Sequence, residues 1–480
     1  MSSAVPDWLA HRADVLPDHE ALIDGDLRIS FSELNQRVLG LVGALEEVGV
    51  KRSDRVAILA QNSVELVEVI HAVPRAGAIL VPLNTRLTTG ELATQMGDAG
   101  VRLLLHERST ELAARTAASA AEVVLLGLPA NGGIPTQTAD THEMDDTHSI
   151  IFTSGTTGRP KGAMLTFGNF WASATGSAFN LGVTSADRWL ACMPLFHVGG
   201  LSIVLRSAIY GTSIVLHHGF DERSVAESLH RDAVTHISVV ASMLQRILDV
   251  DDRRSPPALR VVLVGGGPVP PELLARALER GFPVLQTYGL TEAASQVTTL
   301  APGEALTHLG SAGKPLLTTR LQVDSAPGEP GEILVGGPTV TPGYFGNAAA
   351  TVGAIPDGWL HTGDIGRLDK DGYLFVLDRR DDLIVSGGEN VYPAEVEAVL
   401  IGCPGVVEAA VVGVPDERWG LTVAAALVVS APVTSEEVER WARERLAAYK
   451  IPRIIRFVDE LPRTASGKIQ RRLVRGMFEG

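Results

Sequence analysis

Short apolar runs rich in Val, Ile and Leu alternate with segments of helical periodicity along most of the chain. The apolar runs predict strands near residues 55–60, 78–84, 102–107, 122–127, 213–218, 236–241 and 260–267. Between them, segment 31–49 repeats Leu and Val at helical spacing, with Ser32 and Glu33 as candidate caps, and Pro74 predicts the end of, or a kink in, another helix. This alternation predicts layered α/β sheets whose strands are largely parallel.

The pattern changes after about residue 315. Segments 319–340 and 372–388 contain short apolar runs joined by Gly, Pro and Asp turns, which indicates a small barrel-like antiparallel section. The charged cluster DRRDD at 378–382 predicts the boundary between a large domain, residues 1–381, and a small mobile α+β domain, residues 382–480. Segment 129–146 predicts a mobile connector.

Composition narrows the class of protein. A length of 480 residues exceeds one ordinary core, and a net charge of −15 counts against nucleic acid and anionic membrane surfaces as partners. No apolar run approaches ~18 residues and the N-terminus lacks a signal-peptide pattern, so we expect a cytoplasmic protein without stable membrane insertion. Cys192 and Cys403 lack metal-type spacing, so neither a disulfide framework nor a zinc site is expected. The sequence leaves the oligomeric state open, a homo-oligomer included.

The stretch FTSGTTGRPKGAML, residues 152–165, lies between a predicted strand at 149–152 and a predicted helix that begins near residue 166. Such loops, at the carboxyl ends of strands, are where α/β sheets bind ligands. This loop offers glycines, hydroxyls and cations, namely Gly155, Gly158, Gly162, Thr153, Ser154, Thr156, Thr157, Arg159 and Lys161. Together they predict a polyphosphate site. The loop is not a Walker A motif, because Pro160 precedes Lys161 and Gly162 follows it; a plain surface turn is the alternative.

Further segments extend this pattern: PLFHVGG at 194–200, YGLTE at 288–292, TGD at 362–364, DRRDDLIVSGGENVYPAEVE at 378–397 and PRTASGKIQR at 462–471. With the phosphate loop, they stand in the order found in the adenylate-forming enzymes, and the chain resembles that family over most of its length. The resemblance implies an ATP-dependent acid–CoA ligase that uses ATP, Mg²⁺ and CoA. A carboxylate attacks the α-phosphate of ATP to give acyl-adenylate and pyrophosphate, and the CoA thiol then expels AMP.

The first half-reaction brings an anion to a polyanion, so it needs positive charge and aimed donors rather than a protein nucleophile. The resemblance assigns to Lys468 the bridge between substrate carboxylate and phosphate; taken alone, it is a solvated lysine in a basic tail. It assigns Mg²⁺ to Glu292, whose alternative is a helix-start glutamate after Thr291. Asp364 and Arg379 resemble the ribose contacts, and a turn aspartate and a surface ion pair are their alternatives.

The remaining nucleotide and CoA contacts are also implied by the resemblance. Glycines 265–267 would let the flat adenine approach the backbone, with Tyr288 stacked on one face. The small domain would rotate about Asp382 between the half-reactions, and Gly387 and Gly388 would leave room for the pantetheine arm of CoA. The full implied set is Thr153, Ser154, Gly155, Thr156, Thr157, Gly158, Lys161, Gly265, Gly266, Gly267, Tyr288, Gly289, Thr291, Glu292, Asp364, Arg379, Gly387 and Gly388.

Segments 194–217, 262–300 and 309–316 narrow the resemblance to ligases for an acid with a second carboxylate. His197 resembles the side chain that lines and gates the acyl pocket, and a core histidine is its alternative. Arg206 is a candidate cation for the second carboxylate, and a helix-surface arginine is its alternative. Ser242, Gln296 and Ser311 lie in segments that resemble substrate-facing loops. Another aryl, medium-chain or dicarboxylic acid is the alternative substrate.

Other function classes share parts of this pattern. A luciferase-like monooxygenase would need oxygen and a luciferin-shaped pocket. An amino-acid adenylation module would normally precede a carrier domain, whereas this chain stops soon after Lys468. A non-catalytic nucleotide-binding protein is disfavoured by the presence of Lys161, Glu292, Asp364 and Lys468.

Overall fold

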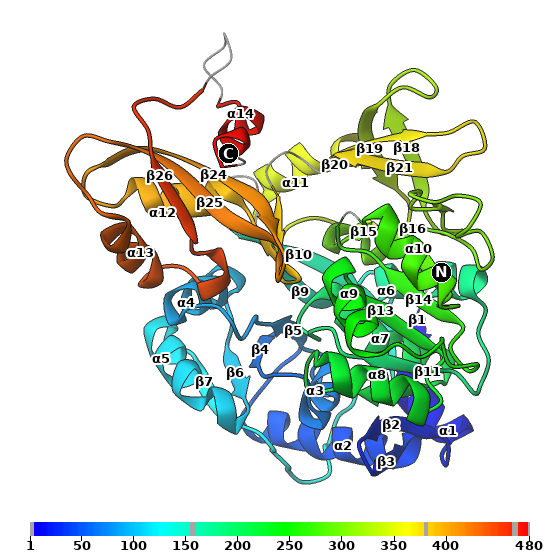
Figure 1. The fold of residues 1–480 in the computed structure, drawn as a ribbon. Coiled ribbons are helices and arrows are strands. Elements are labelled where there is room, and N and C mark those ends of the chain that lie inside the picture. Colours follow the sequence, from blue (N-terminus) through cyan, green and yellow to red (C-terminus); the bar gives the residue numbers. More distant parts are fainter. Residues whose placement is uncertain (1–3, 154–159, 268, 379–382, 463–468, 479–480) are drawn as a thin grey trace.

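The computed structural model describes residues 4–153, 160–267, 269–378, 383–462 and 469–478. A large N-terminal part carries two mixed sheets and a small antiparallel sheet, and a small α+β domain follows it (orange to red in Figure 1). The predicted fold class is therefore confirmed. The boundary predicted at 381/382 lies within residues 379–382, outside the described residues, and it stays a prediction.

The first large sheet has six strands in the order β10-β9-β5-β4-β6-β7. Their bounds are β10 Lys161–Thr166, β9 Thr147–Thr153, β5 Ile79–Pro82, β4 Arg55–Leu59, β6 Leu103–His106 and β7 Val124–Gly127. All neighbours are parallel except β9 and β10, which form an antiparallel pair. The helices between these strands in the chain are α3 Val64–Arg75, α4 Thr89–Ala99 and α5 Glu111–Ala121. The predicted parallel alternation is thus observed.

The second large sheet has nine strands in the order β17-β16-β15-β14-β13-β11-β12-β2-β3, parallel in its centre and antiparallel at both edges. Their bounds are β17 Lys314–Pro315, β16 Ser295–Thr299, β15 Val284–Leu290, β14 Val261–Val264, β13 His236–Val239, β11 Arg188–Ala191, β12 Ser213–Leu216, β2 Glu20–Asp24 and β3 Leu27–Ser30. The associated helices are α1 Trp8–Val15, α2 Phe31–Glu47, α6 Phe167–Leu181, α7 Val198–Tyr210, α8 Glu222–Arg231, α9 Ala241–Val250 and α10 Pro271–Glu279. The short 3₁₀ turn η2 Thr291–Ala293 lies between β15 and β16, and η1 Arg108–Thr110 lies between β6 and α5 of the first sheet.

The predicted antiparallel section is a four-stranded sheet in the order β18-β19-β20-β21. Its strands are β18 Arg320–Asp324, β19 Gly331–Gly336, β20 Leu360–Leu368 and β21 Leu374–Asp378, with α11 Ala348–Ala354 and η3 Pro356–Gly358 between β19 and β20. A separate pair joins β1 Ala4–Pro6 to β8 Thr141–Glu143.

The small domain has its own sheet and its own apolar core. Its strands are β22 Ile384–Ser386, β23 Glu389–Val391, β24 Val406–Asp416, β25 Gly420–Val429 and β26 Ile454–Phe457, and its helices are α12 Pro393–Ile401, α13 Ser435–Arg443, η4 Ala448–Lys450 and α14 Arg471–Gly476. Strands β24 and β25 form a long hairpin whose inward side chains are Val, Ala and Leu. The core of this domain is therefore independent of the large sheets.

Two local predictions need correction. Helix α2 is capped by Ser30 rather than by Ser32, because Ser30 and Glu33 form a reciprocal capping box one residue before the apolar face begins. Segment 129–146 is not a free connector: Gly132 N–H donates to Gly40 at 2.9 Å, Thr136 N–H donates to Glu46 at 2.8 Å, and β8 pairs with β1. These contacts attach the segment to α2. Pro74 lies in the last turn of α3, as predicted.

None of the helices among the described residues is long and apolar enough to cross a membrane. Cys192 and Cys403 are both buried and free, in agreement with the expected lack of a disulfide.

Candidate active site

The two ends of the phosphate loop meet a carboxylate from another sheet. Thr153 ends β9 and Lys161 begins β10, and the two residues are register partners. Thr153 Oγ1 donates to Glu292 Oε1 at 3.2 Å, and the Tyr344 hydroxyl donates to the same oxygen at 2.9 Å. Lys161 Nζ lies 5.4 Å from the centroid of the Tyr344 ring. The predicted Thr153 and Lys161 of the loop and the predicted Glu292 of YGLTE thus converge, together with the hydroxyl of Tyr344, which the sequence reasoning missed.

Glu292 fits the chemistry expected of a Mg²⁺ ligand. It lies on η2 directly after β15, and its half-buried carboxylate is oriented by the hydroxyls of Thr153 and Tyr344. Among the described residues, no three His, Cys, Asp or Glu side chains gather into a metal site. Mg²⁺ commonly takes one or two carboxylates and completes its shell with phosphate oxygens and water, so a single glutamate beside a phosphate loop is adequate.

The backbone around Glu292 is conformationally unusual. Ala294 and Ser295 both have positive φ, 52° and 93°. A Cβ on Gly289 would lie 1.6 Å from the Ser295 carbonyl oxygen, so only glycine permits β15 and β16 to approach this closely. Residues held in such conformations cluster at functional sites, which is consistent with a precisely placed Glu292.

The residues predicted to hold the nucleoside lie together. The Tyr288 hydroxyl, on β15, donates to Asp364 Oδ2, on β20, at 2.7 Å. Gly265 follows β14, and a Cβ there would lie 2.8 Å from Thr287 Cγ2, beside Tyr288. Gly266, with φ of +78°, turns the chain away after the strand. The glycine turn, the tyrosine ring and the aspartate therefore form one continuous region.

The hairpin between β22 and β23 of the small domain lies against this region. Gly387 and Gly388 take positive φ values of 57° and 85° in its turn. A Cβ on Gly388 would lie 3.8 Å from Met243 Cε in α9, and a Cβ on Gly267 would lie 3.9 Å from Val385 Cγ2. The hairpin that carries the glycines predicted for CoA thus lies against α9 and against one of the glycines predicted for adenine.

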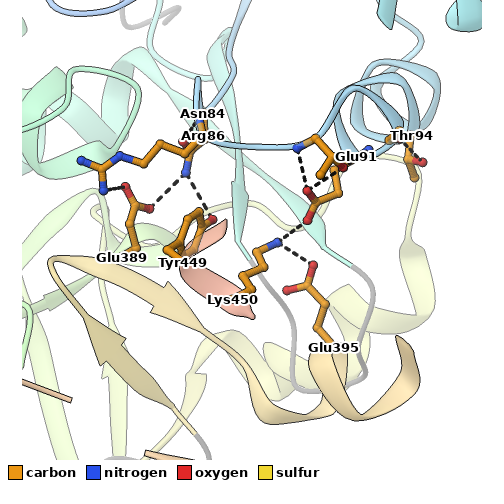
Figure 2. A network of polar contacts seen from close by, with 10 residues as sticks. Asn84, Arg86, Glu91, Thr94, Glu389, Glu395, Tyr449 and Lys450 are labelled. Carbon is orange, nitrogen blue, oxygen red and sulfur yellow. Dashed lines mark hydrogen bonds and ion pairs between the residues drawn. The ribbon is translucent and has the colours of Figure 1, made fainter. Parts of the chain in front are cut away.

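Glu389, which follows Gly388, is a site residue that the sequence reasoning missed. Its buried carboxylate contacts the large domain at three side chains: Arg86 Nη1 at 3.0 Å, Asn84 Nδ2 at 3.0 Å and His197 Nε2 at 3.2 Å (Figure 2 shows Asn84 and Arg86). Burial alone would raise the pKa of Glu389, but the contacts with His197, Arg86 and Asn84 outweigh it and leave the pKa below its usual range. Its place beside two glycines in the VSGGENV motif was the available signal.

Arg206 is buried rather than on a helix surface, which corrects that alternative. Its Nη2 donates to Ser173 Oγ at 3.1 Å, and Ser173 Oγ donates to the Ala294 carbonyl at 2.7 Å, two residues from Glu292. Burial lowers the pKa of Arg206. Among the described residues, Nε has no hydrogen-bond partner and no carboxylate pairs with the guanidinium. A buried arginine without a counter-ion can form an ion pair with a carboxylate of a ligand.

The other substrate candidates differ in whether their polar side-chain atoms already have hydrogen-bond partners. Gln296 is buried, its Nε2 donates to Thr299 Oγ1 at 3.1 Å, and its Oε1 has no partner among the described residues. Ser311 is fully buried, and its hydroxyl already donates to the Leu374 carbonyl at 2.9 Å, which favours a structural role. Ser242 is half-buried at the start of α9, next to Met243 and the small-domain hairpin.

Several predicted site residues lie outside the described residues, namely Ser154, Gly155, Thr156, Thr157, Gly158, Arg379, Asp382 and Lys468. Their roles stay predictions.

Comparison with known families agrees with this geometry. The AMP-binding enzyme model matches residues 9–345, and the AMP-binding enzyme C-terminal domain model matches residues 395–468. The chain belongs to the AMP-binding enzyme family. Among its relatives is a 2-succinylbenzoate–CoA ligase of Bacillus mycoides (strain KBAB4), 47% identical over 481 residues that cover 99% of each chain.

Solved structures of the o-succinylbenzoate CoA synthetase of Bacillus subtilis are similar at 42% identity. A double mutant bound to its product analogue OSB-NCoA superposes with a TM-score of 0.94, covering 99% of each chain. The same enzyme superposes with a TM-score of 0.77 in complex with the acyl-adenylate intermediate OSB-AMP (98% of each chain), and of 0.76 in complex with ATP and magnesium ion (100% of each chain). The present structure therefore superposes more closely on the product-analogue complex than on the acyl-adenylate and ATP complexes.

Proposed function

We propose that the chain catalyses the ATP-dependent ligation of 2-succinylbenzoate to CoA, a step of menaquinone biosynthesis. The observation that carries the proposal is the convergence of Thr153, Lys161 and Glu292 beside the Tyr288–Asp364 pair, because it joins phosphate, metal and nucleoside contacts in one place. The 47% identity to a curated ligase over 99% of the chain supports the choice of acid. ATP and CoA are intracellular metabolites, and a cytoplasmic location is part of the proposal.

In the first half-reaction, the hydroxyl of Thr153 and the ammonium of Lys161 hold the ATP phosphates. Bound Mg²⁺, held by Glu292, neutralises phosphate charge as the acid carboxylate approaches. Asp364 holds the ribose, and the Tyr288 ring packs on adenine. Lys468 brings its cation to the acid carboxylate and the α-phosphate. The cations of Lys161, Mg²⁺ and Lys468 lower the repulsion between the two anions, which is the main barrier to adenylation, whereas Asp364 and Tyr288 position the nucleoside.

In the second half-reaction, the small domain turns about Asp382 and carries the β22–β23 hairpin to the site. The pantetheine arm of CoA passes Gly387 and Gly388, where side chains are absent. Glu389 then contacts His197 at the acyl pocket. The thiol attacks the acyl carbon, and AMP leaves with the phosphate oxygen that it had shared with the acyl group.

The acid carries two carboxylates, and only that of the succinyl arm is activated. Arg206 is the partner of the ring carboxylate in this proposal, since it is buried, cationic and without a counter-ion among the described residues. Gln296, with an unpartnered amide oxygen among those residues, and Ser242 are the further candidates.

The test is an acid panel. Pyrophosphate release from ATP is measured with 2-succinylbenzoate, benzoate, malonate and medium-chain fatty acids, each with and without CoA. The proposal expects 2-succinylbenzoate to exceed every other acid by at least about 100-fold in kcat/KM. A preference for a fatty acid or for benzoate would overturn the choice of acid and leave the ligase chemistry intact.

A further inference from the structure

Lys450 lies between two carboxylates that come from different domains. Its Nζ is 2.6 Å from Glu91 Oε1 and 2.7 Å from Glu395 Oε1 (Figure 2). Lys450 ends η4 and Glu395 lies in the first turn of α12, both in the small domain, whereas Glu91 lies in the first turn of α4 in the large domain. The Lys450 side chain is 3% exposed, so this bridge is shielded from water and from salt screening.

The bridge depends on the charges of its three side chains. Burial alone would lower the pKa of Lys450, but Glu395 and Glu91 outweigh it and raise the pKa, so the ammonium is charged. Breaking a buried ion pair by removing one partner leaves a charge without compensation. Loss of Glu91 therefore disturbs the interface more than loss of an exposed glutamate.

The two halves of the bridge respond differently to rotation of the small domain. The Lys450–Glu395 pair lies inside that domain and persists in any orientation. The Lys450–Glu91 pair crosses the interface 359 residues apart in sequence, and it requires the orientation seen here. The present structure superposes on the product-analogue complex with a TM-score of 0.94, and on the ATP complex with a TM-score of only 0.76. An interaction present in only one of two states shifts the population toward that state.

We propose that Lys450 is a positioning residue for CoA transfer: by joining Glu91 to Glu395, it holds the small domain where the Gly387–Gly388 turn reaches the acid site. This inference rests on the proposed function, because it assigns the bridge to the second of two half-reactions. Asn84, which contacts Glu389 at 3.0 Å and Tyr449 at 3.4 Å, ties the neighbouring part of the same interface.

Glu91→Gln tests the bridge with little disturbance to the fold. Glu91 is the N3 residue of the α4 capping box with Thr88, and glutamine serves equally at N3. The matched control is Glu437→Gln. Glu437 is the exposed N3 residue of the α13 capping box with Thr434, and it contacts no described residue of the large domain. We expect Glu91→Gln to slow transfer of the preformed acyl-adenylate to CoA by about tenfold, and to leave ATP–pyrophosphate exchange within about twofold. Glu437→Gln should change neither rate.

A second pair of variants separates positioning from folding. Lys450→Arg keeps a cation and should retain most of the transfer rate, whereas Lys450→Met should lose at least as much as Glu91→Gln. If both half-reactions fall together, or if transfer is unchanged in Glu91→Gln, the inference is wrong. Amide hydrogen exchange in the presence of CoA gives a readout that needs no acid: Glu91→Gln should lose protection in residues 84–94, and Glu437→Gln should not. Unchanged protection in Glu91→Gln would overturn the bridge even if 2-succinylbenzoate proved the wrong acid.

Discussion

Glu389 Oε2 of the small domain lies 3.2 Å from His197 Nε2 at the start of α7 in the large domain. Glu389 is 2% exposed, so the contact is enclosed between the domains. His197 is the residue predicted to gate the acyl pocket, and Glu389 directly follows the glycines predicted to admit CoA. Under the proposed function, the pair links arrival of this hairpin to the position of the predicted gate.

The first prediction concerns this pair. Glu389→Gln keeps the size of the side chain but removes the charge that Arg86 and His197 contact. We expect CoA transfer to fall by about 10–100-fold, because the buried side chain of residue 389 then no longer attracts the Arg86 guanidinium of the large domain. ATP–pyrophosphate exchange should stay within about threefold, measured in the same preparation. Equal losses in both assays would show that Glu389 supports the fold and not the second half-reaction.

The second prediction concerns the support of Glu292. Tyr344→Phe removes the hydroxyl that donates to Glu292 Oε1 and should raise the Mg²⁺ concentration for half-maximal exchange by about tenfold. Glu292→Gln should have a larger effect in the same titration. Tyr373→Phe is the matched control, because Tyr373 donates to Glu304 Oε1 at 2.8 Å in the same kind of tyrosine–glutamate pair. An identical Mg²⁺ response in Tyr344→Phe and Tyr373→Phe would contradict the assignment.

The third prediction concerns the nucleoside. Tyr288→Phe keeps the ring but removes the 2.7 Å hydrogen bond to Asp364. We expect KM for ATP to rise about 5–10-fold, the equivalent of roughly 1–1.5 kcal/mol, while KM for the acid does not change. Steady-state exchange at varied ATP measures the first KM, and exchange at varied acid measures the second. A rise in KM for the acid alone would place Tyr288 in the acyl pocket instead.

The fourth prediction concerns Arg206 and the ring carboxylate. With 2-succinylbenzoate, Arg206→Gln should lose about 100-fold in kcat/KM, because a buried carboxylate loses its cation. With 4-oxo-4-phenylbutanoate, which lacks the ring carboxylate, the same variant should lose less than about threefold. Thermal unfolding of the variant checks that the protein is folded. A uniform loss with both acids would mean that Arg206 acts through the structure of α7 and not on the ring carboxylate.

The fifth prediction is a pH dependence of stability. Burial lowers the pKa of His71 to about 4 and that of His148 to about 3, from an ordinary value of 6.5. Below pH 6.5 the unfolded chain binds protons that the folded protein refuses, so stability falls as pH falls through this window. From pH 7 to pH 5, each histidine should lower the free energy of unfolding by about 2 kcal/mol.

Urea denaturation at both pH values measures this loss. His148→Phe suits the aromatic surroundings formed by Trp8, Phe167 and Phe170, and it should remove about 2 kcal/mol of the loss. His11→Gln, at an exposed position, is the control. If His148→Phe showed the same drop between pH 7 and pH 5 as the original protein, the buried ring would not be its source.

Local patterns in the sequence predicted most of the fold. The strands β4, β5, β6, β12, β13 and β14 were predicted because their apolar runs are short, β-branched and bounded by turns. The cap at Ser30 was missed by two residues, because two serines, Ser30 and Ser32, lie near the start of α2 and only the backbone geometry selects one. Segment 129–146 was predicted to be free because its composition is that of a linker, and its attachment to α2 depends on contacts far away in the chain.

Among the site residues, too, some were predicted from the sequence and others were not. Thr153 and Lys161 lie in the glycine-rich loop and Glu292 lies in YGLTE, and the resemblance assigned all three to one nucleotide site. The burial of Arg206 was not predictable, since one arginine in an apolar helix can face either side. The Lys450–Glu91 bridge was invisible in the sequence, because both residues are ordinary surface types and only the domain arrangement brings them together.

CoA-dependent release of AMP with 2-succinylbenzoate is the measurement that tests the central claim most directly. We expect AMP and the CoA thioester of the succinyl carboxylate to form in equal amounts when ATP, Mg²⁺, the acid and CoA are all present, and ATP–pyrophosphate exchange to proceed without CoA. The absence of exchange with this acid, or AMP release that does not depend on CoA, would contradict the account.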